Sequence, residues 1–401
     1  MSAPAKILLA AATDWPFPAR LAGAFTALDA RVEAVCLGKS PMRRSACVSR
    51  LHRFSPLKPL TSLARAITAA APELVIPCDD LMAGLLWRLE QVQPELQPLL
   101  SRAVIDGFPL LSSRNDFLRE AAMAGVAIAD TIAVESADDL TRALAVFGLP
   151  LVVKADGCWG GDGVAIARDE AAARAAFQRF SGGSRLKDIA RALKAGQWHL
   201  LARARFALAP RLGAQRFITG RPATSSIACW RGKVLAANHF DVLVSNGTGP
   251  ATVLEISHDP AMAEAARRIA ARFNLSGLYG LDYMRGEDGA TLLLEINPRA
   301  TPTAHLALGP DHDLAAALLT AAGHPIPDRP AVTRQERIAL FPQEWRRDAT
   351  SPHLSAAFHD LPHADSALAA ALGWRSPALT SFSPAIPGLS GFQDAAKDPG
   401  R

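Results

Sequence analysis

Several features are scarce or missing in this sequence of 401 residues, and each absence excludes a class of protein. Cysteine occurs only five times, an odd number, and never in a CxxC pair. We therefore expect neither a disulfide framework nor a zinc site, and a reducing compartment is the default. No uninterrupted apolar run reaches the roughly 18 residues that a membrane span needs, so we expect a cytoplasmic protein with no membrane partner.

The N-terminus has only a short apolar run, in MSAPAKILLAAATDW. A weak signal peptide is one interpretation of this segment. The run is shorter than a usual signal core and continues into strand-like sequence, which favours the first strand of a folded domain.

An excess of either charge is also missing. Lys and Arg number 43 against 38 Asp and Glu, which leaves a net charge of +5. The basic residues are dispersed and lack interleaved aromatics, so a nucleic-acid partner is not expected. Hydrophobic residues make up 49% of the chain and charged residues 20%, which is enough apolar material for a large core and excludes wholesale disorder. The length corresponds to about two to four domains.

The first hundred residues alternate between strand-like and helix-like segments. This alternation predicts a parallel, doubly wound sheet. The GxGxxG turn of dinucleotide-binding folds is absent after the first strand. Strands are expected at residues 6–12, 32–37 and 73–77, and helices at residues 18–28, 60–70 and 81–89.

Two adjacent acids follow the third of these strands, Asp79 and Asp80. Side chains at the carboxyl end of a parallel sheet often contact a ligand. The alternative, which we favour, is that they cap the following helix.

A glycine-rich loop carries the first chemical signal, in PLVVKADGCWGGDGVAIA. Lys154 ends a strand, Gly160, Gly161 and Gly163 follow, and strand propensity resumes at Val164. Backbone N–H groups in such a loop can approach phosphate oxygens closely, and the lysine adds positive charge. The order of lysine and glycines predicts a hairpin tip that covers a nucleotide, whereas an ordinary glycine-rich hairpin is the alternative.

The second signal is a hairpin in GLDYMRGEDGATLLLEINPRA. Period-2 alternation places Leu293, Glu295 and Asn297 on one face of the second strand. Asp282 joins that face only if a bulge shifts the register, and Gly289 is the residue where we expect this bulge. Three hard oxygen ligands on one face suit Mg²⁺, with Mn²⁺ as an alternative.

Another interpretation of this strand is that Glu295 and Asn297 merely face solvent. Asparagine is depleted in strands, which favours the metal site. Arg299 lies just beyond and could form a fork to a transferring phosphoryl group.

The lysine before a glycine hairpin, followed some 140 residues later by Asp282 and the EINPR strand, resembles the ATP-grasp superfamily. The resemblance is greatest to its carbamoyl-phosphate-synthase-like and D-alanine–D-alanine-ligase-like members and covers about residues 112–308. It implies a pre-ATP-grasp doubly wound α/β domain at residues 1–110 and a two-lobed α+β ATP-grasp domain at 111–328. The small lobe is expected at about 111–200 and the large lobe at about 201–328, followed by an appendage with a mobile tail at 329–401.

The resemblance also implies roles for individual residues. Arg114 and Lys154 would bind the phosphates of ATP, and Gly160, Gly161 and Gly163 would cover them. Asp282, Glu295 and Asn297 would hold magnesium, and Arg299 together with Lys154 would act in catalysis. The adenine would pair with backbone groups of a hinge strand, whose residues here are Gln215, Arg216, Phe217 and Ile218.

The sequence departs from the family pattern at two places. Arg114 stands where the family has its first nucleotide lysine, which keeps the charge and changes its geometry. The segment after the hinge, residues 220–223, has no acid for the ribose.

The resemblance implies an ATP-dependent ligase that joins a small-molecule carboxylate to an amine through an acyl-phosphate. Alternatives are another ATP-grasp chemistry, namely a carboxylase or a small-molecule kinase, and a degenerate ATP-binding regulatory module. A homodimer is compatible with each of them. Among the histidines, His305 is the candidate for substrate contact, although a surface or satisfied core histidine is the more common role.

Overall fold

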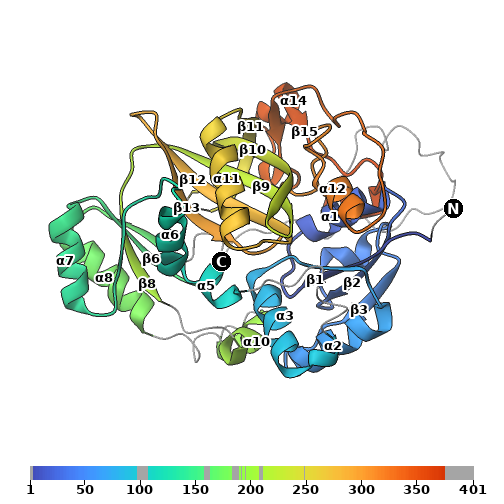
Figure 1. Cartoon of the computed structure of the whole chain (residues 1–401), viewed down its shortest axis with the longest axis horizontal. Helices are drawn as coiled ribbons and strands as arrows, with labels where there is room; N and C mark the ends of the chain where they lie inside the picture. The colour runs from blue at the N-terminus through green and yellow to red at the C-terminus, as the bar shows by residue number, and fades with distance from the viewer. Residues whose placement is uncertain are drawn as a thin grey trace, which may run out of the picture.

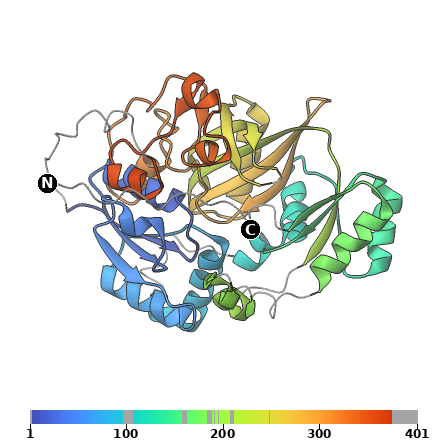
Figure 2. The ribbon, with the colours of Figure 1, turned by 180° about the vertical axis from the view of Figure 1, so that it is seen from behind.

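The computed structural model describes residues 3–96, 107–157, 163–182, 189–190, 192–194, 196–206, 211–247 and 249–374. Three β-sheets lie within these ranges, and helices pack on each of them. In Figure 1 the smallest unit, with α7 and α8, projects to the left, the N-terminal unit lies at the lower right, and the largest sheet lies above and between them. Figure 2 gives the same arrangement from behind. No helix in the described ranges has both the length and the apolar character needed to cross a bilayer.

The N-terminal unit is a parallel four-stranded sheet in the order β3-β2-β1-β4. Helix α1 packs on one face and helices α2 and α3 on the other, which confirms the predicted doubly wound sheet. The strands read as nearly continuous apolar runs because both of their faces are covered. The elements are β1 Lys6–Ala11, α1 Phe17–Thr26, β2 Arg31–Cys36, η1 Pro41–Arg44, β3 Arg50–Arg53, α2 Pro59–Ala70, β4 Leu74–Pro77, α3 Asp80–Val92 and η2 Pro94–Leu96.

The smallest sheet is antiparallel, in the order β5-β8-β6-β7, with α7 and α8 sharing its core. Its last strand in the sequence, β8, lies beyond residue 200, where the division between the two lobes is expected. The chain therefore leaves the small sheet after β7, forms α8 and α10, and then returns to the same sheet as β8. The elements are β5 Thr131–Ala133, α7 Ala137–Phe147, β6 Leu151–Ala155, β7 Val164–Ala167, α8 Glu170–Ser181, α10 His199–Phe206 and β8 Leu212–Arg216.

The largest sheet has the order β13-β12-β9-β10-β11-β14-β15. Helices α6 and α11 share a core with one of its faces, and α12 packs against β9 and β10 from the other face, in the core that also contains α1. This second face therefore looks toward the N-terminal unit (Figure 1). The elements are α5 Phe108–Ser112, α6 Arg114–Met123, β9 Gly220–Trp230, β10 Lys233–Ser245, β11 Ala251–Ile256, α11 Pro260–Arg272, β12 Gly277–Gly286, β13 Thr291–Asn297 and α12 Leu314–Ala321.

The hairpin of β9 and β10 turns at Arg231 and Gly232. Both residues have positive φ, 48° and 78°, and Trp230 pairs directly with Lys233. A two-residue turn with two positive φ values matches the twist of an antiparallel pair, and glycine adopts a positive φ at the second position without steric strain.

The segment at residues 331–374 is joined to the largest sheet. Strand β14 pairs with β11, and β15 pairs with β14. The tail expected to be mobile, from residue 376 onward, lies outside the described residues. The elements are β14 Arg337–Ala339, α13 Gln343–Arg347, α14 His353–Ala356, β15 Phe358–His359 and α15 Ser366–Ala371.

Candidate functional site

The hairpin of β12 and β13 places Asp282 directly opposite Glu295. The next pair along the hairpin is Tyr283 with Leu293, so Leu294 is an extra residue on β13. Such a bulge shifts the side-chain alternation by one residue. As a result Asp282 and Glu295 lie on the same face of the sheet.

The predicted position of this bulge, Gly289, is wrong. Gly289 has a φ of 83° and lies in the turn between the two strands, whereas the extra residue is Leu294. The alternation predicted for β13 also fails at this point. Leu293 and Ile296 are both buried in the core beneath the sheet, so Leu293 does not share the face of Glu295. Because Leu294 is an extra residue, Leu293 and Ile296 both point into the core although they are three positions apart.

Asp282 accepts two hydrogen bonds from neutral donors. Thr224 Oγ1 donates to Oδ1 at 2.8 Å, and Asn297 Nδ2 donates to Oδ2 at 2.9 Å. Burial raises the pKa of this carboxyl, and the negative charge of Glu295 adds to the effect. Among the described residues no cation pairs with Asp282. An added cation at this place would relieve the repulsion between the two carboxylates.

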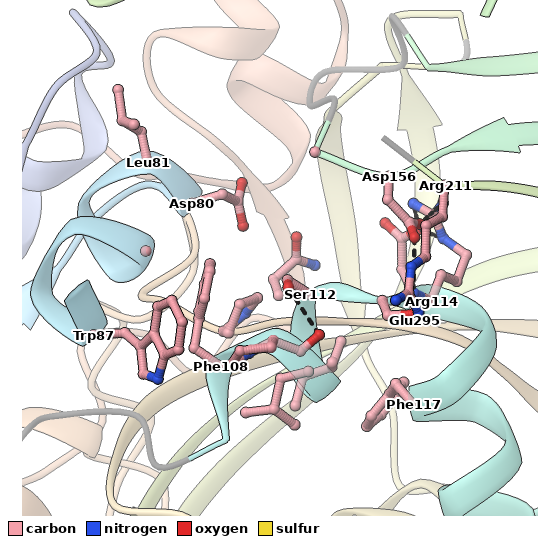
Figure 3. A pocket seen from close by; sticks show the side chains of 18 of the residues that line it. Asp80, Leu81, Trp87, Phe108, Ser112, Arg114, Phe117, Asp156, Arg211 and Glu295 are labelled. Atoms are coloured by element: carbon pink, nitrogen blue, oxygen red, sulfur yellow. Dashed lines mark hydrogen bonds and ion pairs between the residues drawn. The ribbon is translucent and has the colours of Figure 1, made fainter. Parts of the chain in front are cut away.

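Arg114 holds two carboxylates at the head of α6 (Figure 3). Its Nε and Nη2 lie 2.9 and 2.7 Å from Glu295 Oε2, and its Nη1 lies 3.0 Å from Asp156 Oδ1. The backbone N–H of Arg114 also donates to Asp156 Oδ2, at 3.3 Å. The arginine thus joins the small sheet, which carries Asp156 at the end of β6, to the largest sheet.

The charges around Arg114 change the pKa values of its neighbours. Burial opposes ionisation of Glu295, but the positive charges of Arg114 and Lys154 outweigh it and hold the pKa of Glu295 well below its usual range. Burial raises the pKa of Asp156 to about 6, although Arg114 counteracts this. Burial also lowers the pKa of Lys154 to about 8, with Glu295 opposing the shift. Lys154 is only 7% exposed and, within the described part of the chain, makes no ion pair. A buried cation without a close partner indicates a place for an anion.

Arg299, just after β13, is a buried junction between the sheet and the N-terminal unit. Its Nε donates to Asp80 Oδ2 at 3.1 Å, its Nη2 to Asn297 Oδ1 at 3.1 Å and its Nη1 to the carbonyl of Ala300 at 3.2 Å. The guanidinium carbon lies 5.3 Å from the ring centroid of Trp15. The planar fork therefore fixes Asn297 beside the two carboxylates.

The two acids after β4 have different roles. Asp79 caps α3, because its Oδ1 accepts from the N–H of Met82 at 2.8 Å and its Oδ2 from that of Ala12 at 2.6 Å. The capping interpretation is confirmed for Asp79. Asp80 instead reaches Arg299, which brings α3 next to the site.

The side chains of the expected hinge stay within the small sheet. Gln215 is buried, and its Nε2 donates to Thr131 Oγ1 at 3.0 Å. Arg216 pairs with Asp130 at 3.0 Å and lies over the ring of Phe147. Strand β8 lies between β5 and β6, and the N–H of Arg216 donates to the carbonyl of Asp130 at 2.9 Å, so the sheet already uses backbone groups of Gln215 and Arg216.

Two further hinge residues, Phe217 and Ile218, are half-buried and connect β8 to β9. In the glycine loop, Gly163 is buried and its carbonyl accepts from the N–H of Ala155 at 2.8 Å, which closes the base of the β6–β7 hairpin. Gly160 and Gly161 lie outside the described residues.

His305 is buried away from these carboxylates. Its Nε2 lies 2.8 Å from Asp360 Oδ2, and Arg20 of α1 pairs with the same aspartate. The network ties the N-terminal unit to the C-terminal segment, which favours a structural role for His305 over substrate contact, although its buried Nδ1 has no hydrogen-bond partner among the described residues.

A cavity of about 300 Å³ opens beside Arg114 and Glu295 (Figure 3). It lies between α3 of the N-terminal unit, α5 and α6, α10, and the end of β13. The sequence contains no local pattern for it, because its walls come from elements far apart in the chain. Its lining includes Asp80, Leu81, Gly84, Trp87, Arg88, Phe108, Ser112, Arg114, Asp156, Phe206, Glu295 and Asn297.

The oxygen atoms on the hairpin fit a magnesium ion better than a softer metal. No group of three or more His, Cys, Asp and Glu suited to a metal occurs in the described ranges. Two carboxylates and one amide oxygen are the hard ligands that Mg²⁺ takes when water and phosphate complete its shell. Asp282, which forms no ion pair with any residue in the described ranges, is the part of this site that fits the ion best.

Two segments of the chain match known protein families. Residues 113–186 match the ATP-binding domain of the carbamoyl-phosphate synthase L chain. Residues 227–342 match a family described as ATP-grasp in the biosynthetic pathway with Ter operon. The first segment contains Arg114 and Lys154, and the second contains Asp282, Glu295 and Asn297. A search of curated proteins finds no match.

Solved structures resemble this chain over most of its length. The biotin carboxylase domain dimer of the *Hydrogenobacter thermophilus* 2-oxoglutarate carboxylase, in complex with MgADP, ADP and bicarbonate, has a TM-score of 0.60 at 13% identity, and covers 81% of this chain and 71% of that one. N5-carboxyaminoimidazole synthase from *Aspergillus clavatus*, with ADP and 5-aminoimidazole ribonucleotide, has a TM-score of 0.60 at 14% identity, over 82% and 80%. Biotin carboxylase from *Campylobacter jejuni* has a TM-score of 0.57 at 12% identity, over 80% and 72%. The predicted fold, a doubly wound domain followed by a two-lobed ATP-grasp unit, is confirmed.

Proposed function

Because the chain is an ATP-grasp superfamily protein, we propose that it is an ATP-dependent ligase that joins a carboxylate to an amine. The observation that supports this most directly is the pair of facing carboxylates, Asp282 and Glu295, with Asn297 beside them and Lys154 nearby. This set has the charges and ligand types that a Mg–nucleotide complex requires. ATP and Mg²⁺ are accordingly the proposed cosubstrate and metal.

Asp282, Glu295 and Asn297 would hold Mg²⁺. The bound ion would neutralise charge on the phosphate oxygens during phosphoryl transfer. The chain's own residues do the remaining work. Lys154 and the glycine loop bind phosphate oxygens, and the backbone of residues 215–218 pairs with the adenine. Arg299 keeps the amide of Asn297 in place and contributes positive charge next to the transferring group.

The proposed reaction has two steps. A carboxylate oxygen of the substrate attacks the γ-phosphorus, the bond to the bridging oxygen breaks, and ADP leaves with the electron pair. The amine nitrogen then attacks the acyl carbon of the acyl-phosphate, phosphate leaves with its electron pair, and the nitrogen loses a proton to give the amide. No protein nucleophile is needed, and positioning with charge neutralisation supplies the rate enhancement.

A carboxylase is the second candidate, in which bicarbonate takes the place of the organic carboxylate. The carboxylases among the similar folds motivate it. The cavity beside Glu295, about 300 Å³, is larger than bicarbonate needs and favours an organic acid.

The proposal is tested by measuring ADP release from MgATP with pooled carboxylates and pooled amines. We expect release that requires both an acid and an amine. Release with bicarbonate and no other acid would favour the carboxylase, and release with an alcohol in place of an acid would favour a kinase. If MgATP binds and no pool yields ADP, the chain is a regulatory ATP-binding module and the ligase proposal is wrong.

Replacing Lys154 by alanine should weaken MgATP binding at least about tenfold, as expected for the loss of one buried charge-assisted contact to phosphate. Titration calorimetry measures the effect. Lys233→Ala, which removes an exposed lysine from β10, is the matched control and should bind as the native protein does. Equal affinity of Lys154→Ala and the native protein would refute the phosphate role.

The pH dependence of binding gives an independent check on Lys154. Its pKa is lowered to about 8, so the free protein loses this charge as the pH rises above that value. The affinity for MgATP, measured by titration calorimetry, should therefore decrease as the pH is raised above about 8, because binding must then return a proton to Lys154. The Lys154→Arg variant keeps its charge and should show no such decrease.

A further inference from the structure

The cavity beside Glu295 has one wall of apolar and aromatic side chains. Trp87 of α3 and Phe108 of α5 have ring centroids 6.2 Å apart and ring planes tilted by 30°. Gly84, one turn before Trp87, leaves room for Phe108, because a Cβ at this position would come within 3.0 Å of the ring. Phe206 of α10 and Leu81 of α3 complete the wall. These side chains present an apolar, largely aromatic surface to the cavity, on which a flat ring can pack.

The opposite end of the cavity is polar and reaches the proposed reaction centre. Arg114 and Glu295 line it, together with Ser112 of α5 (Figure 3). Asn297 belongs to the same lining. A molecule that fills the cavity therefore has one end on the aromatic wall and the other where the metal and the phosphates are proposed to lie.

The charge of the lining favours an anion. The carboxylates that line the cavity already have arginine partners: Asp80 pairs with Arg299, and Asp156 and Glu295 both pair with Arg114. Arg88 lies 6.0 Å from the centroid of the Trp87 ring and 5.9 Å from that of Phe206, and forms no ion pair with any residue that the structure describes. The charge of Arg88, at the aromatic end of the cavity, attracts an anion into the cavity and repels an amine.

We propose that the carboxylate substrate of this enzyme carries an aromatic ring, which packs against the wall formed by Trp87, Phe108 and Phe206. Its carboxylate then faces Asn297 and Arg114, at the end of β13. This inference rests on the proposed ligase function and adds the class of acid to it. The volume of about 300 Å³ is at the lower end for small-molecule sites, which indicates an acid with one or two rings.

The experiment measures ADP release and direct binding with benzoate, phenylacetate, cyclohexanecarboxylate and acetate. Calorimetry is done on the protein saturated with MgADP, with each acid as the titrant. We expect benzoate or phenylacetate to bind at least about tenfold more tightly than acetate, and more tightly than the saturated ring. Trp87→Ala should raise the dissociation constant of the aromatic acid about tenfold, and Trp87→Phe about threefold or less.

Val92→Ala, at an exposed position of the same helix, is the matched control and should leave both values unchanged. The melting temperature of each variant separates a loss of binding from a loss of folding, and the phenylalanine variant keeps the test valid if alanine does not fold.

The aromatic class is overturned if acetate and the saturated ring bind and react as well as the aromatic acids. It is also overturned if Trp87→Ala loses affinity for MgATP to the same extent as for the acid, because the cavity would then hold the adenine. In both cases the ligase function stands. Failure of the protein to bind MgATP, or to release ADP with any acid, would instead refute the ligase itself.

Discussion

Replacing Glu295 by glutamine should lower ADP release by about a thousandfold, equivalent to about 4 kcal/mol of transition-state stabilisation. Glutamine keeps the size and one oxygen of the side chain but removes the charge that faces Asp282 and pairs with Arg114. The proposed magnesium would lose its central carboxylate. Initial rates under saturating ATP, acid and amine measure the effect.

The fold should survive this change. Arg114 retains Asp156 as an ion-pair partner, and repulsion between Asp282 and its neighbour disappears. Circular dichroism and the melting temperature check this point. Glu287→Gln, at an exposed position in the turn of the same hairpin, provides a control that should retain full turnover. Undiminished turnover of Glu295→Gln would show that the hairpin is not the metal site.

The hairpin that carries Glu295 could be predicted from sequence because two strand-like segments flank a turn that contains Gly286 and Gly289. Its bulge could not. The position of an extra residue depends on which side chains fill the core under the sheet, and here Leu293 and Ile296 both do so. Strand β12 also pairs with β9 on its other side, and this pairing further restricts where the extra residue can lie. No local sequence pattern indicates this pairing.

The residues around Arg114 illustrate another limit. Asp156 follows Lys154 by two positions at the end of a predicted strand, so its presence near the nucleotide loop was open to prediction. Its partner is 42 residues away, and only the packing of α6 against the small sheet brings them together. The aromatic wall was beyond prediction for the same reason. Trp87 lies on α3 and Phe206 on α10, more than 100 residues apart in the sequence.

Replacing Arg299 by lysine should reduce turnover about a hundredfold and lower the free energy of unfolding by about 2 kcal/mol. Arg299 is 6% exposed and donates from three different nitrogens to Asp80, Asn297 and the carbonyl of Ala300. A lysine keeps the charge but has a single nitrogen, which cannot reach all three acceptors. Asn297 would lose its fixed orientation, and Asp80 would lose a buried partner.

Asp80→Asn separates these two consequences. The asparagine oxygen still accepts a hydrogen bond from Arg299 Nε, so the fork and Asn297 should stay in place while the ion pair is lost. We expect a smaller unfolding free energy, measured by urea titration, with turnover reduced less than about threefold. A hundredfold loss in Asp80→Asn as well would mean that Arg299 acts through its attachment to the N-terminal unit. Loss in Arg299→Lys alone would place the effect at the guanidinium beside Asn297, where the transferring phosphoryl group is proposed to pass.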